Sequence, residues 1–82
     1  MKQITIYELL PLLRRGFVSM DSDGEWVWWE TEPQRILTGW VFPREIKNKK
    51  EISYAAHILN NLFNITSFDG DWKDSLMECG NV

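Results

Sequence analysis

The spacing of apolar and polar residues at the start of the chain predicts a short helix over residues 6–15. Thr5 and Glu8 form a capping box, in which each side chain satisfies a backbone N–H group of the first helical turn. Leucines and a tyrosine then supply an apolar face. Because Pro11 removes one helical hydrogen bond, we expect it to kink the helix or to split it into two turns. Gly16 is a suitable residue to end the helix.

Two further runs of apolar residues, 17–20 and 26–30, predict a β-hairpin. The segment between them, Asp-Ser-Asp-Gly at positions 21–24, is typical of a type I turn that ends with glycine in the left-handed region. This turn predicts one register, with the pairs Phe17–Trp29, Val18–Trp28, Ser19–Val27 and Met20–Trp26.

The two faces of this hairpin differ because side chains alternate along a strand. The face that we expect to contact the core carries Val18, Met20, Trp26 and Trp28. The opposite face is mixed and carries Phe17, Ser19, Asp21, Glu25, Val27 and Trp29. A two-layer domain covers one face of its sheet, so the second face leaves two interpretations. Trp29 is either an exposed anchor on it, or a third strand, the chain termini or a second copy of the protein covers it.

The most regular helical pattern lies in the second half of the chain, over residues 49–63. Asn48 and Glu51 form a second capping box at its start. The apolar positions recur with the spacing of one helix face, at Ile52, Ala55, Ala56, Leu59, Leu62 and Phe63. We expect this helix to pack its apolar face against the sheet.

Two weaker elements complete the predicted fold. Residues 35–42 are expected to add a third strand, which Gly39 interrupts and Pro43 closes. Residues 71–78 are expected to form a short third helix. The sequence therefore predicts one α+β domain over residues 1–82, of order α-β-β-(β)-α-(α), in which a small antiparallel sheet packs against an amphipathic helix.

Composition and charge exclude some classes of protein but select no mechanism. Nine basic and twelve acidic residues give a formal net charge of −3 with His neutral. No apolar run approaches the roughly 20 residues that a membrane-spanning helix needs, and no signal-peptide pattern is visible. The single cysteine, Cys79, can form neither an internal disulfide nor, by itself, a structural zinc site. We therefore expect a cytoplasmic protein without a cofactor.

The tryptophans supply the leading functional hypothesis, a protein-binding surface on the hairpin. Five of the 82 residues are tryptophan, and this residue type is enriched among interface hot spots. Residues 17–34 also carry five acidic and no basic residues, a distribution that favours a basic partner. The candidate partner-binding residues are Trp29, Trp40, Asp21, Asp23, Glu25 and Glu30.

Two alternative functions remain open at this point. The segment 44–50 is basic, and Arg44, Lys47, Lys49 and Lys50 could contact phosphates of a nucleic acid. The acidic whole chain opposes that interpretation, because it repels a phosphate backbone. The second alternative is self-assembly, in which the aromatic face joins copies of the chain into a homo-oligomer with a structural role.

Catalytic and metal chemistry find little support in the sequence. The acidic turn at 21–25 lacks the glycine that an EF-hand needs at its sixth position, where this chain has Trp26. The acidic segment 69–74 is typical of a helix entry. His57 and Cys79 belong to no nucleophile or metal motif, and phosphate-binding glycine loops are absent. We therefore expect a protein that is not an enzyme.

Two stretches of the chain together resemble a known group of proteins. The first runs from Ile6-Tyr7-Glu8-Leu9-Leu10 through residues 20–26, and the second is Phe-Asp-Gly-Asp-Trp-Lys-Asp-Ser-Leu at 68–76. Both are similar to segments of small proteins encoded by phages and prophages of gut bacteria. The resemblance implies a phage-type accessory protein that acts in a bacterial cytoplasm, where such proteins often bind and inhibit or redirect one bacterial protein. It names no activity.

Overall fold

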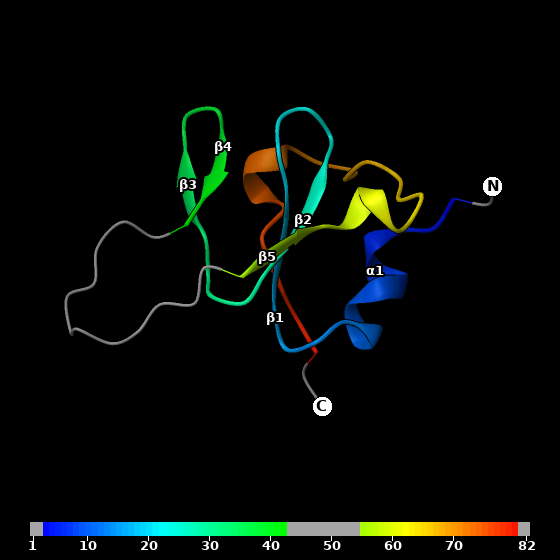
Figure 1. Cartoon of the computed structure of the whole chain (residues 1–82). Coiled ribbons are helices and arrows are strands. Elements are labelled where there is room, and N and C mark those ends of the chain that lie inside the picture. Colours follow the sequence, from blue (N-terminus) through cyan, green and yellow to red (C-terminus); the bar gives the residue numbers. More distant parts are fainter. Residues whose placement is uncertain (1–2, 43–54, 81–82) are drawn as a thin grey trace.

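The N-terminal helix is short and is divided at the proline. The computed structural model describes residues 3–42 and 55–80, and in it helix α1 covers Ile6–Leu9 while a 3-10 helix, η1, covers Leu10–Leu12 (Figure 1). Pro11 lies inside η1, so the predicted split is confirmed.

This helical segment begins where the sequence predicts but ends three residues early. The Thr5 backbone N–H donates to the Glu8 carboxylate at 2.8 Å, as the capping box requires. The segment ends at Leu12, however, so the prediction that it continues to residue 15 is wrong. Gly16 does not cap the helix, because it already belongs to the first strand.

The predicted β-hairpin is confirmed with its register. Strand β1 covers Gly16–Met20 and β2 covers Trp26–Trp29, and their residues pair as expected from Phe17 opposite Trp29 to Met20 opposite Trp26. Gly24 has a φ of 88°, the left-handed conformation that the turn requires. Local turn chemistry therefore sets the centre of the sheet.

Two short strands extend this hairpin to a four-stranded antiparallel sheet of order β5-β2-β1-β6. Strand β5, Ala56–Ile58, pairs with β2, and strand β6, Met77–Cys79, pairs with β1. The Gly80 N–H donates to the Leu10 carbonyl oxygen at 3.2 Å and thus joins the end of β6 to the helical segment.

The region predicted as a third strand forms a separate hairpin instead. Strand β3 covers Gln34–Ile36 and β4 covers Gly39–Val41, and the two pair only with each other as a second sheet (Figure 1). The chain turns at Leu37 and Thr38, in the middle of the predicted strand. The prediction that residues 35–42 add a third strand to the sheet is therefore wrong.

The helix predicted over residues 49–63 is not present in the part that the structure describes. Residues 49–54, with the capping residue Glu51, lie outside the described residues, as does Asn48. Strand β5 and a 3-10 helix, η2 at Leu59–Asn61, stand in its place. The physical reason is the edge of β2: β5 supplies backbone partners to this strand, an interaction that helical periodicity cannot reveal.

The C-terminal segment forms one helical turn rather than a helix over 71–78. The 3-10 helix η3 covers Trp72–Asp74, and Asp71 caps it by accepting the Lys73 N–H at 3.0 Å. The helix-entry interpretation of this acidic segment is thereby confirmed. The chain then extends into β6, because β1 offers it a free edge.

The hydrophobic core has two parts, one on each face of the central hairpin. The first contains the predicted core face, Val18, Met20, Trp26 and Trp28, together with α1, Leu59, Ile65 and Cys79. The second contains Val27, Trp29 and Trp40, with Phe17 and Phe42 against them. The described residues thus form a small domain with one short α-helix, a four-stranded antiparallel sheet and a two-stranded sheet. Within residues 3–42 and 55–80, no helix is long and apolar enough to cross a membrane.

Candidate functional site

The two tryptophans predicted to form an exposed anchor are buried. Trp29 is 6% exposed and Trp40 is 8% exposed. The Trp29 indole N–H donates to the Ser19 hydroxyl at 2.9 Å, and the Trp40 indole N–H donates to the Met20 carbonyl at 3.2 Å. The expectation that Trp29 stands on an open face is therefore wrong.

The β3–β4 hairpin explains this burial. Strand β4 brings Trp40 onto the second face of the sheet, and Phe42 packs edge-on against Trp29 with ring centroids 5.0 Å apart. Residues 35–42, which the sequence predicts as a third strand of the sheet, thus cover one face of the sheet instead.

Two of the acidic residues predicted to rim that site, Asp21 and Asp23, accept hydrogen bonds from backbone N–H groups of the two hairpins. Asp21 accepts the Trp40 backbone N–H at 3.1 Å, and Asp23 accepts the Glu25 backbone N–H at 3.0 Å. Burial raises the pKa of Asp21 above its ordinary value, and the charge of Asp23 raises it further, while the Trp40 hydrogen bond opposes the shift. Glu30 is exposed and lies elsewhere, 3.8 Å from Arg14.

The alternative sites are not assembled in the described structure. The basic residues Arg44, Lys47, Lys49 and Lys50 lie outside the described residues. Among residues 3–42 and 55–80, no three His, Cys, Asp or Glu side chains are grouped so that they could hold a metal ion.

An apolar groove lies instead at the edge of the first core. Its volume is about 290 Å³. Residues 12–14 form one wall, and Leu62 and Phe63, which follow η2, contribute to the other. Trp28 and Leu59 lie between them, with His57 of β5 beside Trp28. We call this feature the Trp28 groove.

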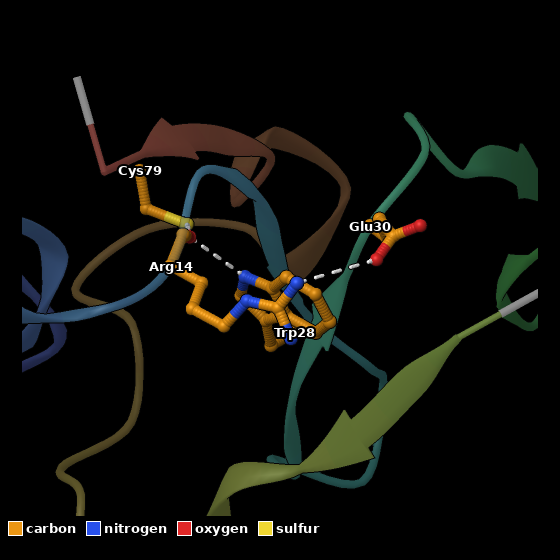
Figure 2. A network of polar contacts seen from close by, with 4 residues as sticks. All are labelled: Arg14, Trp28, Glu30 and Cys79. Atoms are coloured by element: carbon orange, nitrogen blue, oxygen red, sulfur yellow. Dashed lines mark hydrogen bonds and ion pairs between the residues drawn. The ribbon is translucent and has the colours of Figure 1, made fainter. Parts of the chain in front are cut away.

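The floor of the Trp28 groove is held from several sides. The Trp28 ring is 4% exposed, and its N–H donates to the Arg14 carbonyl oxygen at 3.0 Å. The His57 ring stacks on it at 5.6 Å between centroids, and the Arg14 guanidinium lies 5.7 Å from its centroid. Figure 2 shows the Arg14 side chain lying across the Trp28 ring and reaching toward Glu30. The floor is therefore preformed.

The walls of the groove, in contrast, expose large apolar side chains. Leu12 is 79% exposed, Leu62 is 73% exposed and Phe63 is 38% exposed. Single exposed apolar residues are normal on a protein surface, but a group of them around one hollow is a candidate interaction site.

Cys79 also holds the backbone of Arg14, which lines the groove. It is buried, and its thiol donates to the same Arg14 carbonyl oxygen at 3.3 Å (Figure 2). Burial raises the pKa of Cys79, so the thiol keeps its proton, although hydrogen bonds with Trp28 and Gly16 oppose the shift. The Arg14 backbone is thus fixed by two donors while its side chain remains 81% exposed.

A larger hollow of about 450 Å³ lies on the other side of Arg14. Arg14 and Arg15 line it together with Glu30 and Glu78. Cations and acids balance there, and its lining includes none of the strongly exposed leucines. The Trp28 groove is the more specific candidate for these reasons.

Sequence reasoning missed every wall residue of this groove. Leu62 and Phe63 fall on the apolar stripe of the predicted helix, so they were assigned to the core. The signal against that helix was its asparagine content, with Asn60, Asn61 and Asn64 at its end, since asparagine is a poor helix former.

Comparison with known proteins assigns no family to the chain. No family model, no curated protein and no solved structure matches it. The function must therefore be inferred from the geometry of the described residues.

Proposed function

We propose that this protein is a non-enzymatic binding domain that holds a segment of a bacterial protein in the Trp28 groove. The observation that carries the proposal is the grouping of exposed Leu12, Leu62 and Phe63 around a preformed aromatic floor. A preformed floor with exposed apolar walls suits the capture of apolar side chains from a partner.

The energetics of burial support this role. Covering a fully exposed leucine side chain stabilises a complex by about 1.5–3 kcal/mol before the costs of association are subtracted. Leu12 and Leu62 are both more than two-thirds exposed, so most of that contribution is still available to a partner. The same side chains contribute little to the core of the free domain.

The biological setting of the proposal comes from the sequence resemblance. The stretches at 6–10, 20–26 and 68–76 are similar to segments of small phage and prophage proteins of gut bacteria. We accordingly propose an accessory protein in a bacterial cytoplasm that inhibits or redirects the protein it binds. The groove identifies where such a contact would form.

Capture of a partner from a bacterial lysate tests the proposal when two leucine variants are compared. Leu62→Glu places a charge in the groove, whereas Leu37→Glu places the same charge at the β3–β4 turn, where the side chain is 88% exposed and lies outside the groove. We expect wild type and Leu37→Glu to retain the same stoichiometric partner after nuclease treatment, and Leu62→Glu to lose it.

Two results would count against the groove. Equal capture by all three proteins would show that the partner contacts another surface. Recovery that disappears on nuclease treatment would favour nucleic-acid binding through the basic segment 44–50. Circular dichroism of each variant confirms that neither substitution unfolds the domain.

A further inference from the structure

We infer that the segment bound in the Trp28 groove is acidic as well as apolar, and that it brings a carboxylate to Arg14. This inference rests on the proposed function of the groove and specifies the chemistry of its partner. It reverses the charge expected from the sequence, where an acidic hairpin rim favoured a basic partner.

The charge of the groove is the first support. Arg14 and His57 are its only ionisable lining residues among those that the structure describes, and no acidic side chain lines it. This is a cationic site in a chain with twelve acidic and nine basic residues. A basic segment would meet a like charge at Arg14, whereas a carboxylate would meet an opposite charge beside apolar walls.

The state of Arg14 is the second support. Its guanidinium is 3.8 Å from one Glu30 carboxylate oxygen, which is longer than a charge-assisted hydrogen bond. An exposed ion pair of this kind is weak, so Arg14 can exchange Glu30 for another carboxylate at little cost. The guanidinium carries five N–H donors in a planar fork, which matches a carboxylate in two-point contact.

The Arg14 backbone makes this exchange possible without disturbing the fold. Its carbonyl oxygen accepts hydrogen bonds from Trp28 and Cys79, so the base of the side chain is fixed. These two bonds involve only the main chain of residue 14. Substitutions of the side chain should therefore leave these two backbone contacts in place.

The size of the groove limits the apolar part of the ligand. A cavity of about 150 Å³ is large enough to bind benzene. The Trp28 groove has about 290 Å³ and is open to solvent, so it can hold one or two large apolar side chains. The expected ligand is a short segment with such an anchor and an aspartate or glutamate close to it.

A random peptide library displayed against the immobilised full chain tests this inference, with Leu62→Gln protein, which adds no charge to the groove, as the counter-selection. We expect the enriched peptides to combine one or two large apolar residues with Asp or Glu. Synthetic copies of the consensus peptide, one with the acid and one with the corresponding amide, are then titrated by fluorescence anisotropy. The acidic peptide should bind about tenfold more tightly, as one strong charge-assisted contact predicts.

Variants of the ion pair sharpen the result. Arg14→Gln should abolish the difference between acid and amide peptides, and Arg14→Lys should retain part of it because the charge remains. Glu30→Gln should tighten the acidic peptide roughly two- to fivefold, because the weak competing pair is removed.

The outcomes separate this inference from the function on which it rests. Peptides that Leu62→Gln rejects but that are neutral or basic would overturn the acidic partner and keep the groove. Absence of any peptide that distinguishes wild type from Leu62→Gln would overturn both. Concentration-dependent dimerisation that Arg14→Gln abolishes would show that a second copy supplies the acid, and would overturn the assignment to a separate partner.

Discussion

The second face of the hairpin and the Trp28 groove contain similar side chains and differ in what covers them. Trp29 on the second face is 6% exposed, whereas Leu62 on the groove is 73% exposed. The sequence pattern places Leu62 in the core, and it makes Trp29 the leading candidate for an exposed anchor. Exposure in this small domain is therefore decided by the segments that follow the hairpin, and not by the alternation of apolar and polar residues within the hairpin.

The indole N–H groups show which tryptophans belong to the fold. Trp29 and Trp40 donate to Ser19 and to the Met20 carbonyl, and the indoles of Trp26 and Trp28 donate to the carbonyl oxygens of Thr66 and Arg14. A buried indole N–H needs such a partner, and all four of these side chains are buried. The tryptophan cluster is therefore structural.

The largest difference in stability is expected between alanine variants of buried Trp29 and exposed Leu62. Trp29→Ala removes a buried ring from the second core and should lower the free energy of unfolding by about 3–5 kcal/mol. Leu62→Ala removes an exposed side chain and should change it by no more than about 0.5 kcal/mol. Urea denaturation followed by circular dichroism measures both; similar values for the two variants would refute the comparison.

How far the sequence predicts this fold depends on how local each interaction is. The hairpin was predicted with its register because residues 21–24 specify their own turn. The path of 34–42 was not, since the β3–β4 pairing depends on burial against β1 and β2. The helix over 49–63 was wrong in its described part because Ala56 and His57 pair with β2, which is remote in sequence.

The groove lay beyond sequence reasoning for the same reason. It joins residues 12–14, Trp28 and residues 57–63, three segments that only the folded sheet brings together. The candidate residues on the hairpin could be named from the sequence, yet their burial could not. Only the turn chemistry of Asp21, Asp23 and Gly24 follows directly from the residues present.

An intermediate loss of stability is expected when the Ser19 hydroxyl, which accepts the Trp29 indole N–H, is removed. Ser19 is fully buried, so Ser19→Ala leaves the Trp29 indole N–H without an acceptor and should cost about 1–3 kcal/mol. Ser22→Ala is the matched control, because Ser22 is exposed and its bond to the Thr38 carbonyl can be replaced by water. Thermal unfolding of both variants checks this; a Ser19→Ala protein as stable as the Ser22→Ala protein would show that the second face is open to solvent.

The smallest effect concerns the pH dependence that Asp21 contributes. Its pKa is raised in the folded state, so the folded protein binds this proton more tightly than the unfolded chain. The ionised carboxylate consequently opposes folding at neutral pH, and the opposition disappears as the pH falls through the raised pKa. Asp21→Asn keeps an acceptor for the Trp40 N–H and should be equally or slightly more stable at pH 7, by up to about 0.5 kcal/mol.

Urea titrations of wild type and Asp21→Asn over a series of pH values measure that difference. The advantage of the variant should shrink as the pH is lowered from neutral toward the ordinary range of an aspartate. An advantage that grows on acidification would mean that the carboxylate is stabilised in its charged form, and that the second face is less buried than the structure indicates.

The central claim is that a partner contacts the Trp28 groove and not the covered hairpin face. Site-specific photo-crosslinking tests it directly, with a photoreactive amino acid placed at Phe63 in one protein and at Leu37, on the β3–β4 turn, in another. We predict a covalent adduct with a bacterial protein from position 63 and none from position 37. An adduct from position 37 alone would contradict the claim.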